Sequence, residues 1–239
     1  MGYKKSFFTA FMIVLLTATT ALALPTLQLD ISDGWYNPAV GRPGYNPNYD
    51  AETIASSGPV FALYALLNDL KYITNNTTFK ISAALWPKTA VEPQLTPASF
   101  TFNGTTIMIN SMEYGIPPEI GKMLPSHGVF PTYYIEIPFT FDASHKVAAY
   151  NTQDNPGGFD LSRPLGTDFL YYKEFAVDIT NLMPYGYDIH FDLYRDGKLF
   201  APFSHDAQSD PPPVPEPATM LLLGLGLMGL AGVSRKYRK

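Results

Sequence analysis

The chain has 239 residues, no cysteine, 46% hydrophobic side chains and a formal net charge of −5. Residues 24–214 hold 10 of the 16 basic residues and 20 of the 21 acidic residues, so their net charge is near −10. The lack of cysteine excludes disulfides, zinc–thiolate sites and cysteine nucleophiles. The acidic balance argues against a nucleic-acid partner, because binding phosphate groups requires a basic face.

The N-terminal residues have the pattern of a secretory signal. Lys4 and Lys5 precede an apolar run over residues 7–16, and Ala21 and Ala23 supply the small residues that a signal peptidase needs. We therefore predict a signal peptide over residues 1–23, cleaved after Ala23 on export through the Sec translocon. A membrane anchor that stays attached is the alternative, but the run is short for a membrane span.

Alternation of apolar and polar residues predicts strands in most of the following segment. The predicted strands are residues 27–31, 79–85, 105–109, 133–141, 175–179 and 187–193. The apolar run 60–70 fits a buried strand or a short helix, and its neighbours favour the strand. Pro138 inside its strand indicates a sheet edge or a bulge. Frequent turn sequences, such as Asn103-Gly104, separate these runs. We therefore predict an all-β fold for residues 24–209, a single antiparallel β-sandwich of the jelly-roll or immunoglobulin-like type.

His190 and Asp192 are the first candidates for a metal site. They are two positions apart on a predicted strand, so their side chains share the face opposite Phe191. Two ligands are too few for a site, and His205-Asp206 would complete it only if the fold brought the two segments together. We favour a solvated strand face and a polar loop, and we assign no metal here.

Calcium is the second metal to consider. Asp30, Asp33 and residues 151–160 offer the hard oxygen ligands that calcium prefers. No stretch matches an EF-hand, and residues 151–158 read more simply as a tight turn whose polar side chains satisfy its own backbone. We therefore predict no cofactor and keep calcium as an alternative.

No recognisable catalytic constellation is present. The G-x-S-x-G motif is absent, and no Ser-His-Asp set or paired-carboxylate motif can be identified from spacing. We predict that the chain is not an enzyme, and we rank an exported glycan hydrolase third among the functional hypotheses.

Aromatic residues suggest a different function, carbohydrate binding. Trp35, Tyr36, Tyr45 and Tyr49 belong to a loop rich in Pro, Asn and Gly, where their rings could stack on sugars. The alternative, which we favour, is that the aromatic residues fill the β-sheets.

The C-terminus has three consecutive parts. Residues 210–217 form a proline-rich linker that contains Pro215, Glu216 and Pro217. The next 16 residues, 218–233, are apolar and would span about 24 Å as a helix, slightly less than the ~30 Å hydrocarbon core. The basic residues that follow would stop transfer on the cytoplasmic side: Arg235, Lys236, Arg238 and Lys239. We predict a transmembrane helix and basic tail over residues 218–239.

In this order, the three parts resemble the PEP-CTERM sorting signal. The resemblance implies processing near Pro215-Glu216-Pro217 by an exosortase-type membrane protease of exopolysaccharide-producing, Gram-negative bacteria. Proline holds the linker extended, which suits a protease substrate, and Glu216 is expected to serve as a recognition handle. The protein would then be anchored transiently in the inner membrane and released or transferred to the cell surface or extracellular matrix.

The exported segment resembles the choice-of-anchor N family of surface domains. The residues that carry the resemblance are 27–31, 52–54, 79–85 with Pro87-Lys88-Thr89, 128–131, 150–158 and 189–194. The resemblance implies an exported globular unit and no catalytic residue.

The leading hypothesis is a non-enzymatic surface or matrix protein sorted by its C-terminal signal. The alternative is a module that binds exopolysaccharide, assisted by calcium.

Overall fold

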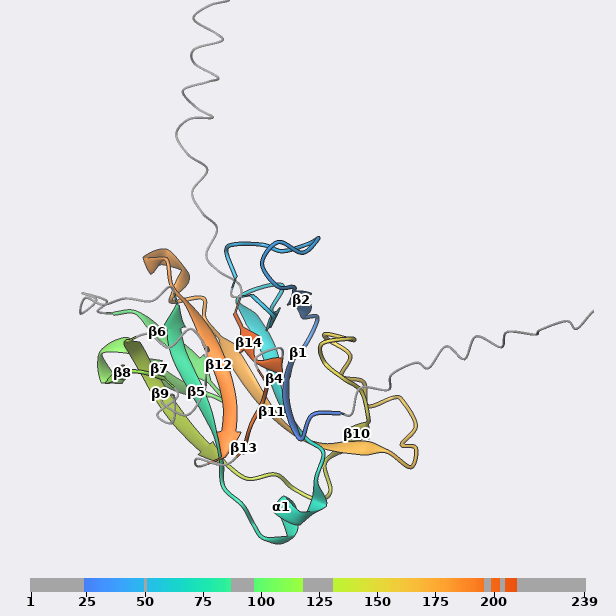
Figure 1. Ribbon diagram of the computed structural model, residues 1–239. Coiled ribbons are helices and arrows are strands. Elements are labelled where there is room, and N and C mark those ends of the chain that lie inside the picture. Colours follow the sequence, from blue (N-terminus) through green and yellow to red (C-terminus); the bar gives the residue numbers. More distant parts are fainter. Residues whose placement is uncertain are drawn as a thin grey trace, which may run out of the picture.

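The computed structural model describes residues 24–49, 51–86, 97–117, 131–195, 199–202 and 205–209. The predicted signal peptide, the linker from residue 210 and the predicted transmembrane helix lie outside these residues. The described residues form two β-sheets that pack face to face, with one α-helix of five residues, α1 (Leu70–Thr74), at one end (Figure 1).

The first sheet is antiparallel throughout its described pairs. Its order is β1 (Leu27–Ile31), β4 (Val60–Leu67), β11 (Phe169–Asp178), β6 (Ser99–Phe102) and β7 (Thr105–Met108), and β10 (Lys146–Ala148) also pairs with β11. The long pairing of β4 with β11 places Phe61 opposite Val177 and Leu67 opposite Tyr171.

The second sheet is mixed. Its order is β2 (Trp35–Asn37), β3 (Thr53–Ala55), β14 (Ala207–Gln208), β12 (Asp188–Arg195), β5 (Phe79–Trp86), β9 (Thr132–Phe139) and β8 (Glu113–Gly115), and β13 (Leu199–Phe200) also pairs with β12. The prediction of a purely antiparallel sandwich is wrong at one pair, because β14 runs parallel to β3. A strand of two residues gives no periodic pattern from which its pairing could be predicted.

Most predicted strands are confirmed, with two local differences. The strand in the run 60–70 ends at Leu67, and Asp69 then caps α1 by accepting a hydrogen bond from the Lys71 amide at 3.0 Å. Two short 3₁₀ helices were not predicted: Ile109–Ser111 follows β7 directly, and Met183–Tyr185 follows a turn. Pro138 lies at a sheet edge as predicted, because β8 pairs only with the first three residues of β9.

The main core lies between the two sheets. Phe191 of β12 packs against Phe61 and Phe102 of the first sheet, with ring centroids 6.2 and 6.3 Å apart. Phe139 of β9 makes an edge-to-face contact of 5.1 Å with Phe175 of β11. These contacts, together with the complete burial of β1, support the sandwich architecture.

A second, smaller hydrophobic cluster covers the outer face of the first sheet. The chain after β10 crosses this face, and the Phe159 ring stacks on Tyr64 with centroids 3.7 Å apart. Leu66, Tyr150 and Leu170 are buried in the same cluster. Both faces of β4 are therefore covered, which explains the nearly continuous apolar sequence of this strand.

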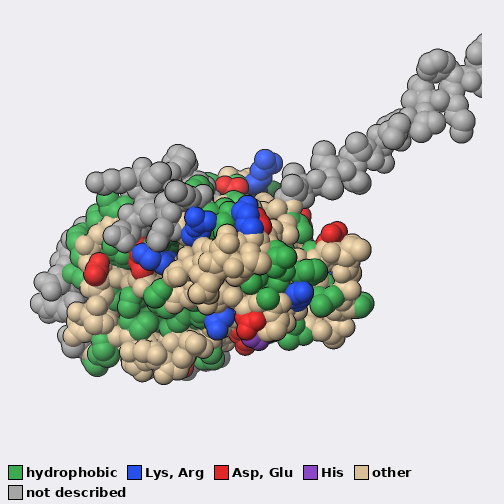
Figure 2. Space-filling model, turned by 90° about the horizontal axis from the view of Figure 1, so that it is seen from below, with side chains coloured by type: hydrophobic (Ala, Val, Ile, Leu, Met, Phe, Trp, Pro, Cys, Tyr) green, Lys and Arg blue, Asp and Glu red, His purple; other side chains and the backbone are tan. Residues whose placement is uncertain are grey.

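The described surface combines both signs of charge with uncharged and apolar side chains. Figure 2 shows acidic and basic groups scattered over one face, without a basic patch on its described part. Among the described residues, no helix has the length and hydropathy needed to cross a membrane.

Candidate functional site

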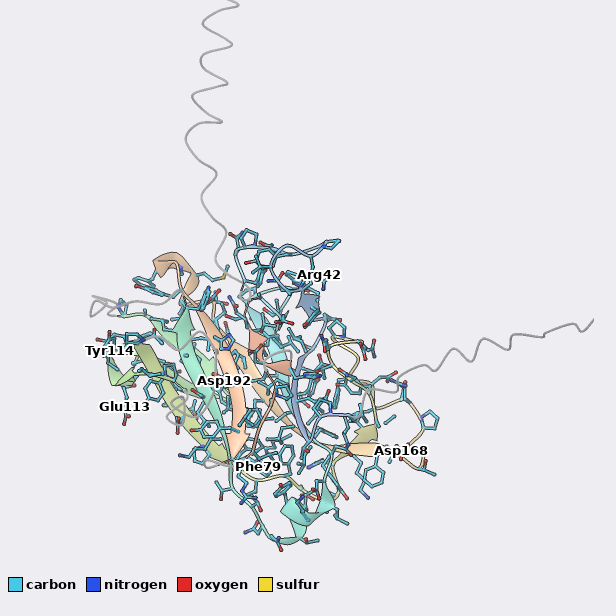
Figure 3. All side chains as sticks on the ribbon, viewed as in Figure 1. Arg42, Phe79, Glu113, Tyr114, Asp168 and Asp192 are labelled. Atoms are coloured by element: carbon cyan, nitrogen blue, oxygen red, sulfur yellow. The ribbon has the colours of Figure 1, made fainter. Side chains whose placement is uncertain are left out.

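A row of polar side chains on β12 lies buried on the side of the strand opposite the main core. Asp188, His190 and Asp192 are 0, 5 and 7% exposed. Figure 3 shows Asp192 on β12, toward the middle of the second sheet. The prediction of a solvated face at His190 and Asp192 is therefore wrong, because alternation indicates which side chains share a face and not whether another segment covers it.

The fold brings Asp206 to this row. His190 on β12 pairs with Gln208 on β14, and continuing this antiparallel register by two residues places Asp206 opposite Asp192. Asp206 is 3% exposed, and its backbone carbonyl accepts a hydrogen bond of 3.1 Å from the Ile54 amide. The sequence-based condition for a third ligand is thus met by Asp206.

Nε2 of His190 lies between the two carboxylates. It is 3.7 Å from Oδ1 of Asp192 and 3.5 Å from Oδ2 of Asp206, and one ligand atom from each of the three residues lies within 4.8 Å of the others. Both distances exceed the 2.7–2.9 Å of a charge-assisted hydrogen bond. The three groups therefore face one another at separations longer than a short charge-assisted hydrogen bond.

The residues around this cluster hold it in place. The Trp86 ring lies beside His190, with centroids 6.4 Å apart. Gln208 donates a hydrogen bond of 3.1 Å to Oδ2 of Asp188, and the Ile189 amide donates to the Ser209 hydroxyl at 2.7 Å. Both hydrogen bonds lie on the same side of the cluster, where the start of β12 meets Gln208 and Ser209.

His205 has a different partner. Its Nε2 lies 2.9 Å from Oδ1 of Asn151, so the ring joins the segment before β14 to the loop after β10. Burial lowers the pKa of His205 to about 4, which keeps the ring neutral at pH 7. In this neutral ring Nε2 carries the hydrogen and donates a hydrogen bond to Oδ1 of Asn151.

Asp30, the first calcium candidate, accepts hydrogen bonds from its own strand and from the segment after β10. Its Oδ1 accepts hydrogen bonds from the amides of Ile31 and Gly157 at 2.9 and 2.7 Å, and its Oδ2 accepts one from the Tyr150 hydroxyl at 2.7 Å. Burial raises the pKa of Asp30 to about 6, and these hydrogen bonds limit the rise. Donors occupy the oxygens that calcium would need, so the geometry does not favour calcium at Asp30.

The 151–158 turn is held by its own backbone and by the first sheet. Asn151 accepts hydrogen bonds of 2.9 Å from the Gln153 amide and 3.0 Å from the Asn155 amide, through its side chain and its carbonyl, respectively. Gln28 of β1 accepts a bond of 3.0 Å from the Thr152 amide. The prediction of a tight turn is confirmed, and the contact with β1 adds a second support.

The aromatic loop is largely folded on itself. Trp35 meets Tyr49 edge to face at 4.8 Å, and Tyr49 is only 8% exposed. The Tyr36 hydroxyl accepts a hydrogen bond of 3.0 Å from Gln153. These contacts support the structural interpretation for Tyr49, whereas Trp35, Tyr36 and Tyr45 are half-buried.

Two clefts flank β9 near the edge of the second sheet. The larger, about 530 Å³, opens between the sheets and has Phe102, Phe139 and Phe175 among its lining residues. The smaller, about 320 Å³, is lined by Ser111, Glu113, Tyr134, Ile135 and Glu136. Glu113 lies at the outer edge of the second sheet (Figure 3), and the Glu136 carboxylate pairs with Lys80 at 3.1 Å.

Comparison with protein-family models shows which kind of signal the C-terminal segment contains. The model of the PEP-CTERM protein-sorting motif matches residues 213–236. The chain carries a PEP-CTERM sorting signal. Such signals are recognised by exosortase, a membrane protein, and they indicate export and membrane-associated sorting to the cell surface. No curated protein and no solved structure matches the chain.

The PEP-CTERM match includes the sorting residues that the sequence indicated. Pro215, Glu216 and Pro217 and the basic residues Arg235 and Lys236 lie within it, whereas Arg238 and Lys239 follow it. All of them, like Ala21 and Ala23 of the predicted signal peptide, lie outside the described residues. The resemblance of the exported segment to the choice-of-anchor N family is not confirmed and stays a prediction.

Proposed function

We propose that the chain is a non-enzymatic protein of the cell surface or extracellular matrix of a Gram-negative bacterium, delivered by its PEP-CTERM signal. The observation that carries this proposal is the match at residues 213–236, which begins four residues after the last described residue, Ser209. A protease that acts on the linker would leave every described strand in place.

The end of the described unit supports this interpretation. The Ser56 amide donates a hydrogen bond of 3.0 Å to the Gln208 carbonyl, and the Ser209 amide donates one of 2.9 Å to the Ile189 carbonyl. The chain is thus held in the sheet up to Ser209. The proline-rich linker that follows would present Pro215-Glu216-Pro217 at a distance from the fold, in the extended form that proteases bind.

The proposal is tested by following processing and location of the chain in its own host. Deletion of residues 215–217, or Glu216→Ala, should leave an uncleaved form in the inner membrane, because the exosortase loses its recognition motif. Glu174→Ala is the matched control, since it removes an exposed carboxylate from β11 on the first sheet. Cleavage and surface delivery that stay unchanged in both motif variants would contradict the proposal.

Carbohydrate binding is the second candidate function, and the smaller cleft favours it. Carboxylates, a serine hydroxyl and a tyrosine ring line this cleft, and sugar sites combine such hydrogen-bonding groups with an aromatic face. Glu113 is exposed, so its carboxylate can accept hydrogen bonds from sugar hydroxyls without first being desolvated. The expected ligand is the exopolysaccharide of the producing cell.

A pull-down of the chain with this polysaccharide tests the second candidate. Glu113→Gln should reduce retention several-fold, and the matched control Glu174→Gln should not. Repeating the incubation with and without a chelator tests whether calcium assists binding of the polysaccharide. Release of new reducing ends that Glu113→Gln abolishes would instead support the glycan hydrolase, whereas equal retention of both variants would count against this cleft.

A further inference from the structure

We propose that His190, Asp192 and Asp206 bind a divalent cation of the zinc type, which fastens β14 to β12. This site is independent of the sorting signal and of the cleft beside β9. It joins the last described strand of the sheet to a strand that begins 19 residues earlier, at Asp188.

The spacing of the three side chains fits such an ion. Zinc binds histidine nitrogen and carboxylate oxygen at about 2.0–2.2 Å, and tetrahedral geometry then separates two ligand atoms by about 3.3–3.5 Å. Nε2 of His190 is 3.5 Å from Asp206 and 3.7 Å from Asp192. Small rotations of the side chains would complete the geometry, because all three ligand atoms already lie within 4.8 Å of one another.

The charges of the cluster are compatible with a bound cation. The register between β12 and β14, extended by one residue, places Asp206 opposite Asp192, and both are buried. Like charges directly opposite in a sheet destabilise it, and their repulsion grows where water is excluded. One divalent cation balances two carboxylates, while His190 contributes a neutral imidazole ligand.

The ligand atoms, one imidazole nitrogen and two carboxylates, indicate which class of ion would bind. Calcium takes six to eight oxygen ligands, and magnesium demands octahedral oxygen coordination with several waters. Imidazole suits zinc and its first-row neighbours, and three protein ligands leave one position for water. A buried site with one nitrogen and two carboxylates therefore favours a zinc-type cation over calcium.

Trp86 provides a reporter for binding at this site. Its ring lies beside His190, and the chain contains only one other tryptophan, Trp35. The test uses the full-length chain with Trp35→Phe, purified in detergent, stripped with a chelator and titrated with zinc. We expect one zinc per chain, a change in Trp86 fluorescence at the same equivalence point, and a higher unfolding temperature with zinc than with chelator.

Three variants locate the zinc. Asp192→Asn and Asp206→Asn keep the size of the side chain and should each weaken zinc binding at least tenfold. His145→Gln is the matched control, because His145 forms an exposed pair with Asp142 at 4.0 Å; its zinc binding should not change. Calcium and magnesium, titrated in parallel, should produce no change in Trp86 fluorescence at equal concentration.

Zinc titration of the chain with the unaltered cluster tests the proposal even if an Asn variant fails to fold. Absence of stoichiometric zinc uptake by the folded Trp35→Phe chain, or uptake without a change in Trp86 fluorescence, would overturn the proposal. Zinc binding that survives both Asn substitutions in folded chains would overturn it as well, and would leave the three side chains as an ion-pair network.

Discussion

Asp30 and Tyr150, 120 positions apart in the sequence, share a buried hydrogen bond of 2.7 Å between the tyrosine hydroxyl and Oδ2 of the carboxylate. The Gly157 amide donates to the other oxygen of the same carboxylate at 2.7 Å. One side chain of β1 therefore holds both ends of the 150–157 segment against the outer face of the first sheet. Tyr64 and Leu66 are buried in the same hydrophobic cluster as Tyr150.

Tyr150→Phe should destabilise the protein by about 1–3 kcal/mol, because it removes a donor from a buried carboxylate while keeping the ring. Urea unfolding of the two chains measures the difference. Tyr185→Phe is the matched control, since Tyr185 is 38% exposed and a change within about 0.5 kcal/mol is expected. Equal stability of Tyr150→Phe and the wild type would show that the hydrogen bond contributes no net stability.

The second prediction concerns pH. Burial raises the pKa of Asp30 from 3.8 to about 6 in the folded state. Between these values the folded chain keeps the proton that the unfolded chain has lost, so the contribution of Asp30 to stability is present below pH 4 and is lost as the pH rises through about 6. The loss is at most about 3 kcal/mol.

Asp30→Asn supplies the reference for this measurement. The difference in unfolding free energy, wild type minus Asp30→Asn, should fall between pH 4 and about 7, as the pH passes the folded pKa of about 6, and stay constant from pH 7 to 8. The other carboxylates are common to both chains, so their contributions largely cancel. A difference that is flat across this range, or that increases with pH, would contradict the raised pKa.

The sequence predicted most of the longer strands in which packing against the core imposes a period of two, but it missed β6, where Phe100 and Phe102 are buried. Residues 27–31 form β1 within the predicted bounds, and the alternation over residues 187–193 corresponds to β12. Residues 207–208 gave no such signal, although they connect β3 with β12. Two-residue strands are determined by their neighbours in space, and those neighbours are distant in sequence.

The candidate metal cluster was predictable only in part, for a similar reason. The spacing of His190 and Asp192 indicates a shared face, since residues i and i+2 of a strand point the same way. Their burial, and the approach of Asp206, depend on the register between β12 and β14. No local pattern encodes that register, so the sequence could name Asp206 as a possible third ligand without placing it.

A third prediction compares two glycines with similar backbone angles. Gly157 and Gly41 have φ values of +65° and +81°, so alanine is strained at both positions. A Cβ on Gly157 would also lie 2.9 Å from the Gly34 nitrogen, whereas a Cβ on Gly41 would meet nothing within 4 Å. Gly157→Ala should therefore cost about 1–3 kcal/mol more than Gly41→Ala, as overpacked sites do. Thermal unfolding of both variants measures the difference, and equal losses would mean that the 157 turn moves away from Gly34 without penalty.

The last prediction tests where the folded unit ends. A stop after Ser209 should leave a chain that unfolds cooperatively with nearly wild-type stability, because the hydrogen bonds of β14 and Ser209 to β3, Ser56 and β12 are kept. A stop after residue 204 removes these bonds and uncovers Ile54 and Ile189, which are fully buried. Exposing two such side chains, at about 1.5–3 kcal/mol each, removes a large part of the 5–15 kcal/mol that stabilises a typical domain.

Both truncated chains, each beginning at Leu24, can be compared by circular dichroism and urea unfolding. We expect a cooperative transition for the longer chain and a lost or strongly weakened one for the shorter. If the longer chain also failed to fold, residues beyond Ser209 would belong to the folded unit, and cleavage in the linker could not release it intact. If the shorter chain kept wild-type stability, β14 would contribute little to the sheet, and a cation that fastens it to β12 would have no effect on unfolding.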